Sequence, residues 1–382
     1  MRIRKLSFVD GCQGWSFDNF EFDRLTLLVG ASASGKTQTI HSMYRLYEVS
    51  QGVNLDGIKW DVEFTFGGTG EGSVYRWTGE FQKINMPMYV RLWEENVNSK
   101  LLREELYENG KLIVERKGAD IFLEGKETVR LSQYVSILFL LKSDPRVRPV
   151  QKAFSRIKLI DGTTGDDLKD FKKHINLFGR TLIDKKEYDT IEKIRKSSYP
   201  AIVKMDLARQ IKSEVYDDIM ERFKEIFPQV KVIKMCPIAE DKGYLSRIPF
   251  VQIREKGSDN WIPQFNMSAG MCRTLNQLAE MYLCPEGTLF LIDEFENSLG
   301  INSLEDLTAD VINAGRDLQF IISSHHAYII NNIDVRSWRL ISREGNKILS
   351  RPVLELMDED SAHEYFMQLL QLDEYRSGRR RL

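Results

Sequence analysis

The order of hydrophobic and polar residues changes character several times along the chain. Residues 24–29 form an apolar run that stops at Gly30, and a stretch with helical spacing follows a few residues later. This pattern predicts a strand, a loop and a helix in succession. Over residues 62–129, short alternating runs are separated by Gly-rich or Asn-Gly turns, which is typical of an antiparallel sheet. We therefore expect residues 1–144 to form the N-terminal part of a domain, with an antiparallel sheet beside the loop.

A region rich in Lys and Glu follows from residue 145 to 228, and its helical spacing predicts a helical insertion. Its apolar repeat is too short and irregular for a long coiled coil, which needs several sustained heptads. Residues 229–382 alternate between helix-like and strand-like segments. The apolar runs 288–292 and 319–322 are interpreted as short, buried, parallel strands. The pattern as a whole predicts an α/β fold in which a helical insertion separates two parts of one domain.

Composition and charge narrow the class of protein. The chain has 382 residues, of which 42% are hydrophobic, and this is ample material for a buried core. The 54 basic and 56 acidic residues argue against a protein that coats nucleic acid indiscriminately, although a local nucleic-acid contact stays possible. The longest apolar stretch, Val135–Leu141, is far short of the ~20 residues that span a bilayer. With no signal-peptide pattern and four scattered cysteines, we expect a cytoplasmic protein without a membrane partner.

Residues 30–37, with the sequence Gly-Ala-Ser-Ala-Ser-Gly-Lys-Thr, match the P-loop pattern in full. Such a loop turns its backbone N–H groups around phosphates at a helix N-terminus, while Lys36 reaches the β- and γ-phosphates and the Thr37 hydroxyl binds Mg²⁺. An ordinary Gly/Ser turn is the alternative, and the flanking strand and helix argue against it. The predicted ATP-binding residues are Gly30, Ala31, Ser32, Ala33, Ser34, Gly35, Lys36, Thr37 and Gln38.

Two acidic residues, Asp293 and Glu294, directly follow the apolar run 288–292. Both carboxylates are expected where a parallel strand meets the ligand crevice. Asp293 would hold Mg²⁺ through its water shell, and Glu294 would orient or deprotonate the attacking water. Solvated acids often follow strands without any such role, but the P-loop upstream favours the functional interpretation.

Two further motifs resemble those of ABC-type ATPases. Residues 266–271, ahead of the acidic strand, resemble the signature motif, in which a serine hydroxyl and glycine amides meet the γ-phosphate bound by the other subunit; here these are Ser268 and Gly270. A plain Ser N-cap is the alternative. A Ser-His pair ends the strand at 320–324, where the same family carries its switch histidine, so we assign that role to His325 and interpret its neighbour as structural or solvated.

The order of P-loop, signature, acidic strand and histidine is that of the ABC and SMC-like ATPases, over roughly residues 1–140 and 230–340. More narrowly, residues 293–300, 267–271 and 323–326 are similar to the AAA/OLD-type ATPases of bacterial antiphage defence systems. The resemblance implies an α/β P-loop NTPase with an ABC-ATPase-like head, made of a mixed sheet and an antiparallel β subdomain. It also implies an ATPase that uses ATP and Mg²⁺.

The resemblance further implies a homodimer or higher homo-oligomer, because the signature serine reaches the phosphate of another chain. It implies control of a separate effector subunit, a toxin or nuclease, and too few residues follow His325 for a nuclease domain. Ala269 replaces a signature glycine and Gly300 stands where many relatives have aspartate, so slow hydrolysis is expected. Gln133 is a candidate for the glutamine of the Mg²⁺ shell, with a plain solvated glutamine as the alternative.

Two alternative functions remain. A DNA-repair or DNA-tethering ATPase of the SMC kind would carry a long coiled coil, and a transporter subunit would lack the insertions.

Trp15 and Phe17 could approach adenine but are better explained as core or edge aromatics. The basic tail 376–381 could touch nucleic acid or an acidic partner, and we interpret it as solvated and mobile.

Overall fold

The computed structural model describes most of the chain, namely residues 1–66, 72–84, 98–160, 185–237, 249–297, 299–359 and 361–380. The chain divides into two compact units. The sheet unit comprises residues 1–160, 287–293 and 315–382, and the helical unit comprises residues 161–286 and 294–314. The three-part division expected from the sequence, 1–144, 145–228 and 229–382, stays a prediction.

The sheet unit is built on one sheet of 14 strands, in the order β10-β14-β15-β3-β16-β17-β2-β1-β4-β5-β6-β7-β8-β9. The first five strands run parallel to one another. They are β10 (Ile157–Ile160), β14 (Thr288–Ile292), β15 (Leu318–Ser323), β3 (Leu25–Val29) and β16 (Trp338–Glu344). Every residue of β14 and β15 is buried, as expected for central parallel strands covered on both faces. The mixed α/β fold predicted from the sequence is confirmed.

The other part of the sheet is antiparallel from β2 onward. Its strands are β17 (Lys347–Pro352), β2 (Trp15–Glu21), β1 (Arg2–Asp10), β4 (Ile58–Thr65), β5 (Val74–Phe81), β6 (Leu101–Glu108), β7 (Lys111–Lys117), β8 (Asp120–Leu123) and β9 (Lys126–Glu127). Burial alternates along β4 and β5, so hydrophobic residues gather on one face. Trp15 and Phe17 stack there with Phe8, which confirms their interpretation as core aromatics.

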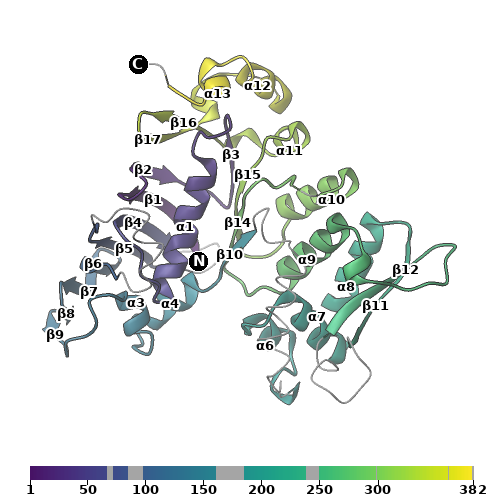
Figure 1. The fold of residues 1–382 in the computed structure, drawn as a ribbon, viewed down its shortest axis with the longest axis horizontal. Helices are drawn as coiled ribbons and strands as arrows, with labels where there is room; N and C mark the ends of the chain where they lie inside the picture. Colours follow the sequence, from purple (N-terminus) through teal and green to yellow (C-terminus); the bar gives the residue numbers. More distant parts are fainter. Residues whose placement is uncertain are drawn as a thin grey trace. The chain divides into compact units, whose positions relative to one another are not determined.

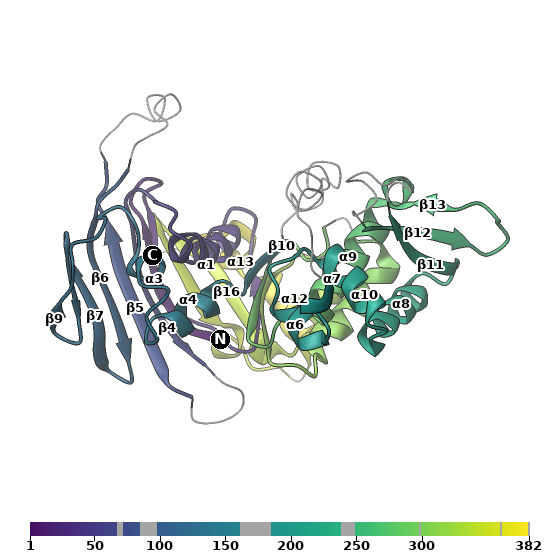
Figure 2. The same cartoon turned by 90° about the horizontal axis from the view of Figure 1, so that it is seen from below.

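Helix α1 (Lys36–Ser50) lies along one face of this sheet (Figures 1 and 2). It buries Ile40, Met43, Leu46 and Val49, whose spacing of three residues places them on one side of the helix. The other helices of the sheet unit are short: α3 (Ile137–Leu140), α4 (Arg148–Phe154), α11 (Ala327–Asn332), η4 (Val335–Ser337), η5 (Val353–Glu355), α12 (Ala362–Leu369) and α13 (Asp373–Ser377). Figure 1 shows α13 near one end of α1, and α3 and α4 near the other.

The helical unit contains helices and a three-stranded antiparallel sheet. The helices are η1 (Lys185–Glu187), α6 (Ile191–Lys196), α7 (Ala201–Gln210), α8 (Glu214–Ile226), η3 (Gln264–Asn266), α9 (Ala269–Leu283) and α10 (Ile301–Ile312), and the strands are β11 (Val230–Pro237), β12 (Pro249–Glu255) and β13 (Ile262–Pro263). Helices α7 and α8 pack against α9. Arg222 of α8 forms ion pairs with Asp306 and Asp310 of α10, at 3.0 and 3.1 Å.

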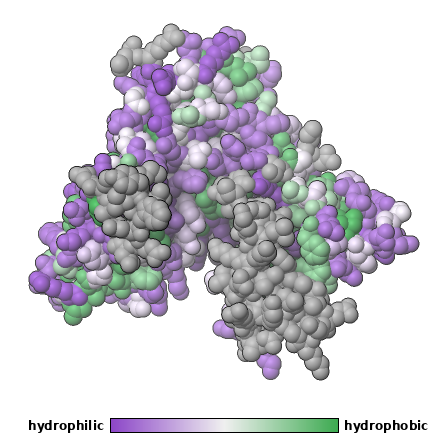
Figure 3. Space-filling view, viewed as in Figure 1, coloured by the Kyte–Doolittle hydropathy of each residue, from purple (hydrophilic) through white to green (hydrophobic). Residues whose placement is uncertain are grey.

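On the face seen in Figure 3, most of the coloured residues are hydrophilic. Figure 3 shows hydrophobic residues in small groups between hydrophilic ones, one of them over the strands β6 to β9. In that part of the sheet Val129 and Leu102 are 76% and 47% exposed. Among the helices that the structure describes, none has both the length and the apolar character needed to cross a bilayer.

Candidate functional site

The predicted site residues of the sheet unit lie at one edge of its parallel strands. Since β10, β14, β15, β3 and β16 run in one direction, their carboxyl ends share that edge. The register aligns Ile292 with Ile322, and Ser323 with Leu28. The P-loop after β3, Asp293 after β14 and His325 after β15 therefore emerge together. Strand β15 separates β14 from β3, which places Asp293 about 10 Å from the P-loop strand and leaves room for a hydrated metal ion.

The P-loop follows β3 in a conformation that requires glycine at two positions. Gly30 has φ of 143°, and a Cβ on it would lie 2.4 Å from the carbonyl oxygen of Ile341 in β16. Gly35 has φ of 116°, and a Cβ there would lie 2.8 Å from the side chain of Ile348 in β17. Both the left-handed backbone and the close neighbours exclude larger residues. The loop is thus fitted directly against the β16–β17 hairpin.

Lys36 begins α1 and is buried within the loop. Its Nζ donates hydrogen bonds of 2.8 Å to the carbonyl oxygens of Gly30 and Ala31, which hold the ammonium group over the loop. The Oγ of Ser34 is buried and has no hydrogen-bond partner. A buried hydroxyl without a partner is costly, so a ligand oxygen at this loop would satisfy it. The arrangement is that of an anion-binding loop at a helix N-terminus.

A divalent cation could be held by Thr37 and Asp293. Thr37 is exposed in the first turn of α1, next to Gln38, whose side-chain oxygen accepts a hydrogen bond from Arg343 of β16. Within the described ranges, no three His, Cys, Asp or Glu side chains gather as a metal-binding group. One hydroxyl and one carboxylate fit the preference of Mg²⁺ for a few protein oxygens completed by water and phosphate oxygens.

Asp293 is oriented by its neighbours in the sheet. Its backbone N–H donates to the carbonyl oxygen of Ile160 at 2.9 Å, and Ser323 donates from Oγ to its Oδ1 at 2.5 Å. Ser323 is buried at the end of β15. Outer contacts of this kind fix the direction of a metal-binding carboxylate. Ser323 was not among the predicted residues, although a polar residue closing an apolar strand beside the acidic strand was a signal for it.

Glu294 is exposed and has a left-handed backbone, with φ of 51°. It is the first residue of its segment in the helical unit, directly after Asp293. The N–H of Asn297 donates to its carbonyl oxygen at 2.7 Å and closes a tight turn. Positive φ in a residue other than glycine costs about 1–3 kcal/mol and is concentrated at functional sites. The strain sits on the residue that the sequence assigns as the base.

Ser268 and Gly270 lie at the N-terminus of α9, in the helical unit. Ser268 is exposed, and its Oγ accepts a hydrogen bond of 3.2 Å from the N–H of Met271. It is therefore an N-cap, as the simpler interpretation expected. A capping hydroxyl still carries a proton to donate, so the cap and a phosphate contact are compatible.

His325 follows β15 and is exposed at the edge that carries the P-loop. His326 has a structural role, since its Nδ1 accepts a hydrogen bond of 3.2 Å from the N–H of Tyr328 and caps α11. Its own N–H donates to Oγ of Ser324 at 3.0 Å. These contacts give His326 a structural role, as the sequence predicts, and the switch role of His325 stays a prediction.

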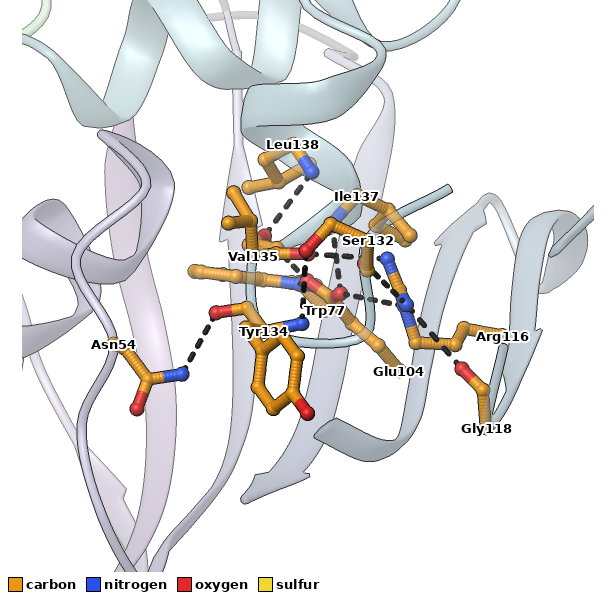
Figure 4. A network of polar contacts seen from close by, with 11 residues as sticks. Asn54, Trp77, Glu104, Arg116, Gly118, Ser132, Tyr134, Val135, Ile137 and Leu138 are labelled. Atoms are coloured by element: carbon orange, nitrogen blue, oxygen red, sulfur yellow. Dashed lines mark hydrogen bonds and ion pairs between the residues drawn. The ribbon is translucent and has the colours of Figure 1, made fainter. Parts of the chain in front are cut away.

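A buried polar network lies in the antiparallel part of the sheet (Figure 4). Glu104 and Arg116 are both fully buried, with Nε of Arg116 at 3.7 Å from Oε2 of Glu104. The carboxylate accepts hydrogen bonds from Nε1 of Trp77 at 2.9 Å, Oγ of Ser136 at 2.5 Å and the N–H of Ile137 at 2.8 Å. Burial raises the pKa of Glu104, while Arg116 and the three donors act in the opposite direction.

This network fixes the loop that contains Gln133. The guanidinium of Arg116 donates to the carbonyl oxygens of Ser132 and Val135, both at 3.0 Å, on either side of Gln133. Gln133 itself pairs through its carbonyl oxygen with the N–H of Leu101 at 2.8 Å. The loop is therefore held against the antiparallel part of the sheet.

The structure does not bring Gln133 to the P-loop. Asn54, just beyond the C-terminal end of α1, donates to the carbonyl oxygen of Tyr134 at 2.7 Å. The P-loop lies at the other end of α1, whose 15 residues span about 20 Å. A glutamine side chain is far shorter than this. The assignment of Gln133 to a Mg²⁺ shell therefore has no geometric support within the sheet unit.

Comparison with known families gives one match. The model of a family described as "AAA domain, putative AbiEii toxin, Type IV TA system" matches residues 140–331, which is half of the chain. No curated protein matches the chain.

Solved structures of similar fold include heads of SMC proteins. An SMC head bound to the C-terminal winged-helix domain of ScpA has a TM-score of 0.51 and 13% identity, and the similarity covers 94% of this chain and 99% of that chain. The SMC head of Thermotoga maritima has a TM-score of 0.46 at 13% identity, covering 92% and 99%. The Pyrococcus furiosus Smc head with an extended coiled coil, bound to the C-terminal domain of ScpA, has a TM-score of 0.48 at 12% identity, covering 97% and 98%. At this identity the first similarity concerns the fold alone.

Proposed function

Because this chain belongs to the AAA-domain family whose model matches residues 140–331, we propose that it binds ATP with Mg²⁺ and hydrolyses it slowly. The observation that carries the proposal is the shared edge of the sheet. There the P-loop, with Lys36 held against its own carbonyl groups, emerges beside Asp293. An anion-binding loop next to an oriented carboxylate is the arrangement that a metal-bound triphosphate needs.

The proposal assigns a role to each of the predicted residues. Residues 30–38 bind the phosphates, with Lys36 neutralising the β and γ groups. Thr37 and Asp293 would hold Mg²⁺, which when bound offsets the charge that develops on the phosphate oxygens. Glu294 orients or deprotonates the water that attacks the γ-phosphate. His325 donates a hydrogen bond to the γ-phosphate and so distinguishes ATP from ADP.

We propose that ATP also joins two chains head to tail. In this arrangement the exposed Ser268 hydroxyl and the amides around Gly270 contact the γ-phosphate held by the other chain. Ligand that binds the dimer better than the monomer shifts the equilibrium toward the dimer, and hydrolysis releases it. Ala269 and Gly300, which depart from the usual motifs, favour a long-lived clamp over rapid turnover.

The dimer is proposed to act in the cytoplasm by holding or releasing a separate toxic effector during phage infection. The motif resemblance to ATPases of antiphage systems supports this role, and the family description names a putative toxin of a type IV TA system. The alternative, an SMC-like DNA-tethering ATPase, has less support because no described helix exceeds 15 residues. DNA binding that is stimulated by ATP and weakened by salt would favour that alternative.

The decisive experiment replaces Glu294 by Gln. The variant is expected to bind ATP like the wild type, to lose at least about 100-fold in hydrolysis, as for removal of a general base, and to accumulate as a dimer with ATP. Binding is measured by calorimetry, hydrolysis by phosphate release and association by light scattering. Glu296→Gln is the matched control, since it removes a nearby carboxylate of the same turn and should hydrolyse normally. Normal hydrolysis by Glu294→Gln, or normal ATP binding by Lys36→Ala, would overturn the proposal.

A further inference from the structure

The segment 373–380, called the arm below, packs on the P-loop. It contains α13 and ends the described part of the chain. Gly378 follows α13 with φ of 66°, and a Cβ on it would lie 3.2 Å from Cβ of Ala31 and 3.5 Å from Cβ of Ser34. The backbone of the arm thus touches the phosphate-binding loop directly. Figure 1 shows α13 beside the end of α1 that carries the loop, and Figure 3 shows strongly hydrophilic residues around it.

The arm also pairs with β16, just beyond the point where the pairing of β16 with β3 ends. Strand β16 pairs with β3 over Trp338–Leu340, and β3 then turns into the P-loop. Further along β16, the N–H of Arg343 donates to the carbonyl oxygen of Gly378, and the N–H of Arg380 donates to that of Arg343, both at 2.9 Å. Arg343 and Arg379 are consequently parallel bridge partners. The P-loop lies between β3 and the arm.

Side-chain contacts anchor the arm to the sheet. Glu374 accepts a hydrogen bond of 2.5 Å from Oγ of Ser342 and forms an ion pair with Arg351. Tyr375 is buried. In the tail 376–381, which the sequence predicts to be solvated, Arg376, Ser377, Arg379 and Arg380 are exposed and Gly378 is buried. The backbone pairing with β16 and the packing of Gly378 on the P-loop leave no trace in local composition.

The pairing decides which arginine faces the nucleotide. Residues paired in register have side chains on the same face of a sheet, and successive residues point to opposite faces. Arg343 reaches Gln38 in the first turn of α1, so Arg379 emerges on that face and Arg380 on the other. Nε of Arg343 is buried without a hydrogen-bond partner, and the exposed side chain of Arg379 has no ion pair among the described residues. Two paired arginines on one face, neither of them in an ion pair with any described residue, favour an anion between them.

We propose that Arg343 of β16 and Arg379 of the arm together form a second cationic contact to the polyphosphate of the nucleotide. The arm brings Arg379 to the P-loop. This rests on the proposed ATP site and adds to it a nucleotide-binding element from a distant part of the sequence. Guanidinium groups suit phosphate oxygens because they donate two parallel hydrogen bonds. The contribution should therefore grow with the number of phosphates, in the order AMP, ADP, ATP.

The test compares two neighbouring arginines. Arg379→Ala is expected to weaken ATP binding at least about five-fold, as for loss of one charge-assisted hydrogen bond, and AMP binding less. Arg380→Ala removes the same charge one residue away and should change the dissociation constant less than about two-fold, since an exposed charge on the other face acts weakly. Arg379→Lys should lie between Arg379→Ala and the wild type. Dissociation constants are measured by calorimetry, and circular dichroism confirms that each variant is folded.

The outcomes separate this inference from the proposed function. Unchanged ATP binding by Arg379→Ala, with binding lost in Lys36→Ala, would refute the role of the arm and leave the ATP site intact. Equal weakening by Arg379→Ala and Arg380→Ala would also refute it, because the effect would then be one of general charge. Unchanged binding in Lys36→Ala would overturn the proposed function itself.

Discussion

Replacing Arg116 by Met should destabilise the protein strongly. The change leaves the fully buried carboxylate of Glu104 without its cation, and it leaves the carbonyl oxygens of Ser132 and Val135 without the donors they have now. Removing one partner of a buried ion pair costs about 3–5 kcal/mol. The free energy of unfolding of a domain is about 5–15 kcal/mol, so the loss is a large part of the total. Urea unfolding followed by tryptophan fluorescence measures it, and Trp77 reports on the network directly.

The pH dependence of the variant's stability provides a second test of this prediction. Arg116 lowers the pKa of Glu104, which burial raises, so in Arg116→Met that pKa rises further. A carboxyl whose pKa is higher in the folded protein takes up a proton on folding. The stability of the variant therefore falls as the pH rises from the unfolded pKa, about 4.3, to the raised folded pKa. Its deficit against the wild type should be smaller at pH 5 than at pH 8.

The matched control for this prediction is the double variant Glu104→Gln/Arg116→Met. It removes both charges, keeps an acceptor for Trp77, and should recover to within about 2 kcal/mol of the wild type with little dependence on pH, since isosteric replacement of a buried pair is often nearly neutral. The reasoning would be refuted by a loss below about 1 kcal/mol in Arg116→Met. A deficit that does not change with pH and is not rescued by Glu104→Gln would refute it equally.

Two further predictions concern the end of β14. Glu294→Gly should raise the free energy of unfolding by about 1 kcal/mol, because glycine accepts the φ of 51° without strain, while hydrolysis is lost; urea unfolding and phosphate release would test this, and a less stable variant would contradict it. Ser323→Ala removes the hydrogen bond to Oδ1 of Asp293 and should raise the Mg²⁺ concentration for half-maximal hydrolysis about ten-fold, as for other outer contacts of metal ligands. A magnesium titration that matches the wild type would speak against Asp293 as the metal-binding acid.

The chemistry-bearing motifs could be predicted because each is contiguous. A P-loop needs glycines and a lysine at fixed spacing, and the acidic strand is an apolar run with carboxylates at its end. Both depend on a few adjacent residues. The buried strands β14 and β15 were recognisable for the same reason, since central parallel strands are apolar at every position.

The features that could not be predicted depend on the order of strands in space. Gln133 was a candidate for the Mg²⁺ shell, yet its loop contacts Asn54, just beyond the C-terminal end of α1. The pairing of Arg343 with Arg379 and the bond between Ser323 and Asp293 join segments that are distant in sequence. Such contacts follow from which strands are neighbours, and no local pattern encodes this.

The last strand of the large sheet also bears on how the protein associates. Strand β9 has two residues, Lys126 and Glu127, and both are exposed. An edge strand that is short and charged offers few unpaired backbone groups to another copy of the chain. This edge of the 14-stranded sheet is therefore a poor template for the addition of further strands. Growth by strand addition is thereby discouraged at this border.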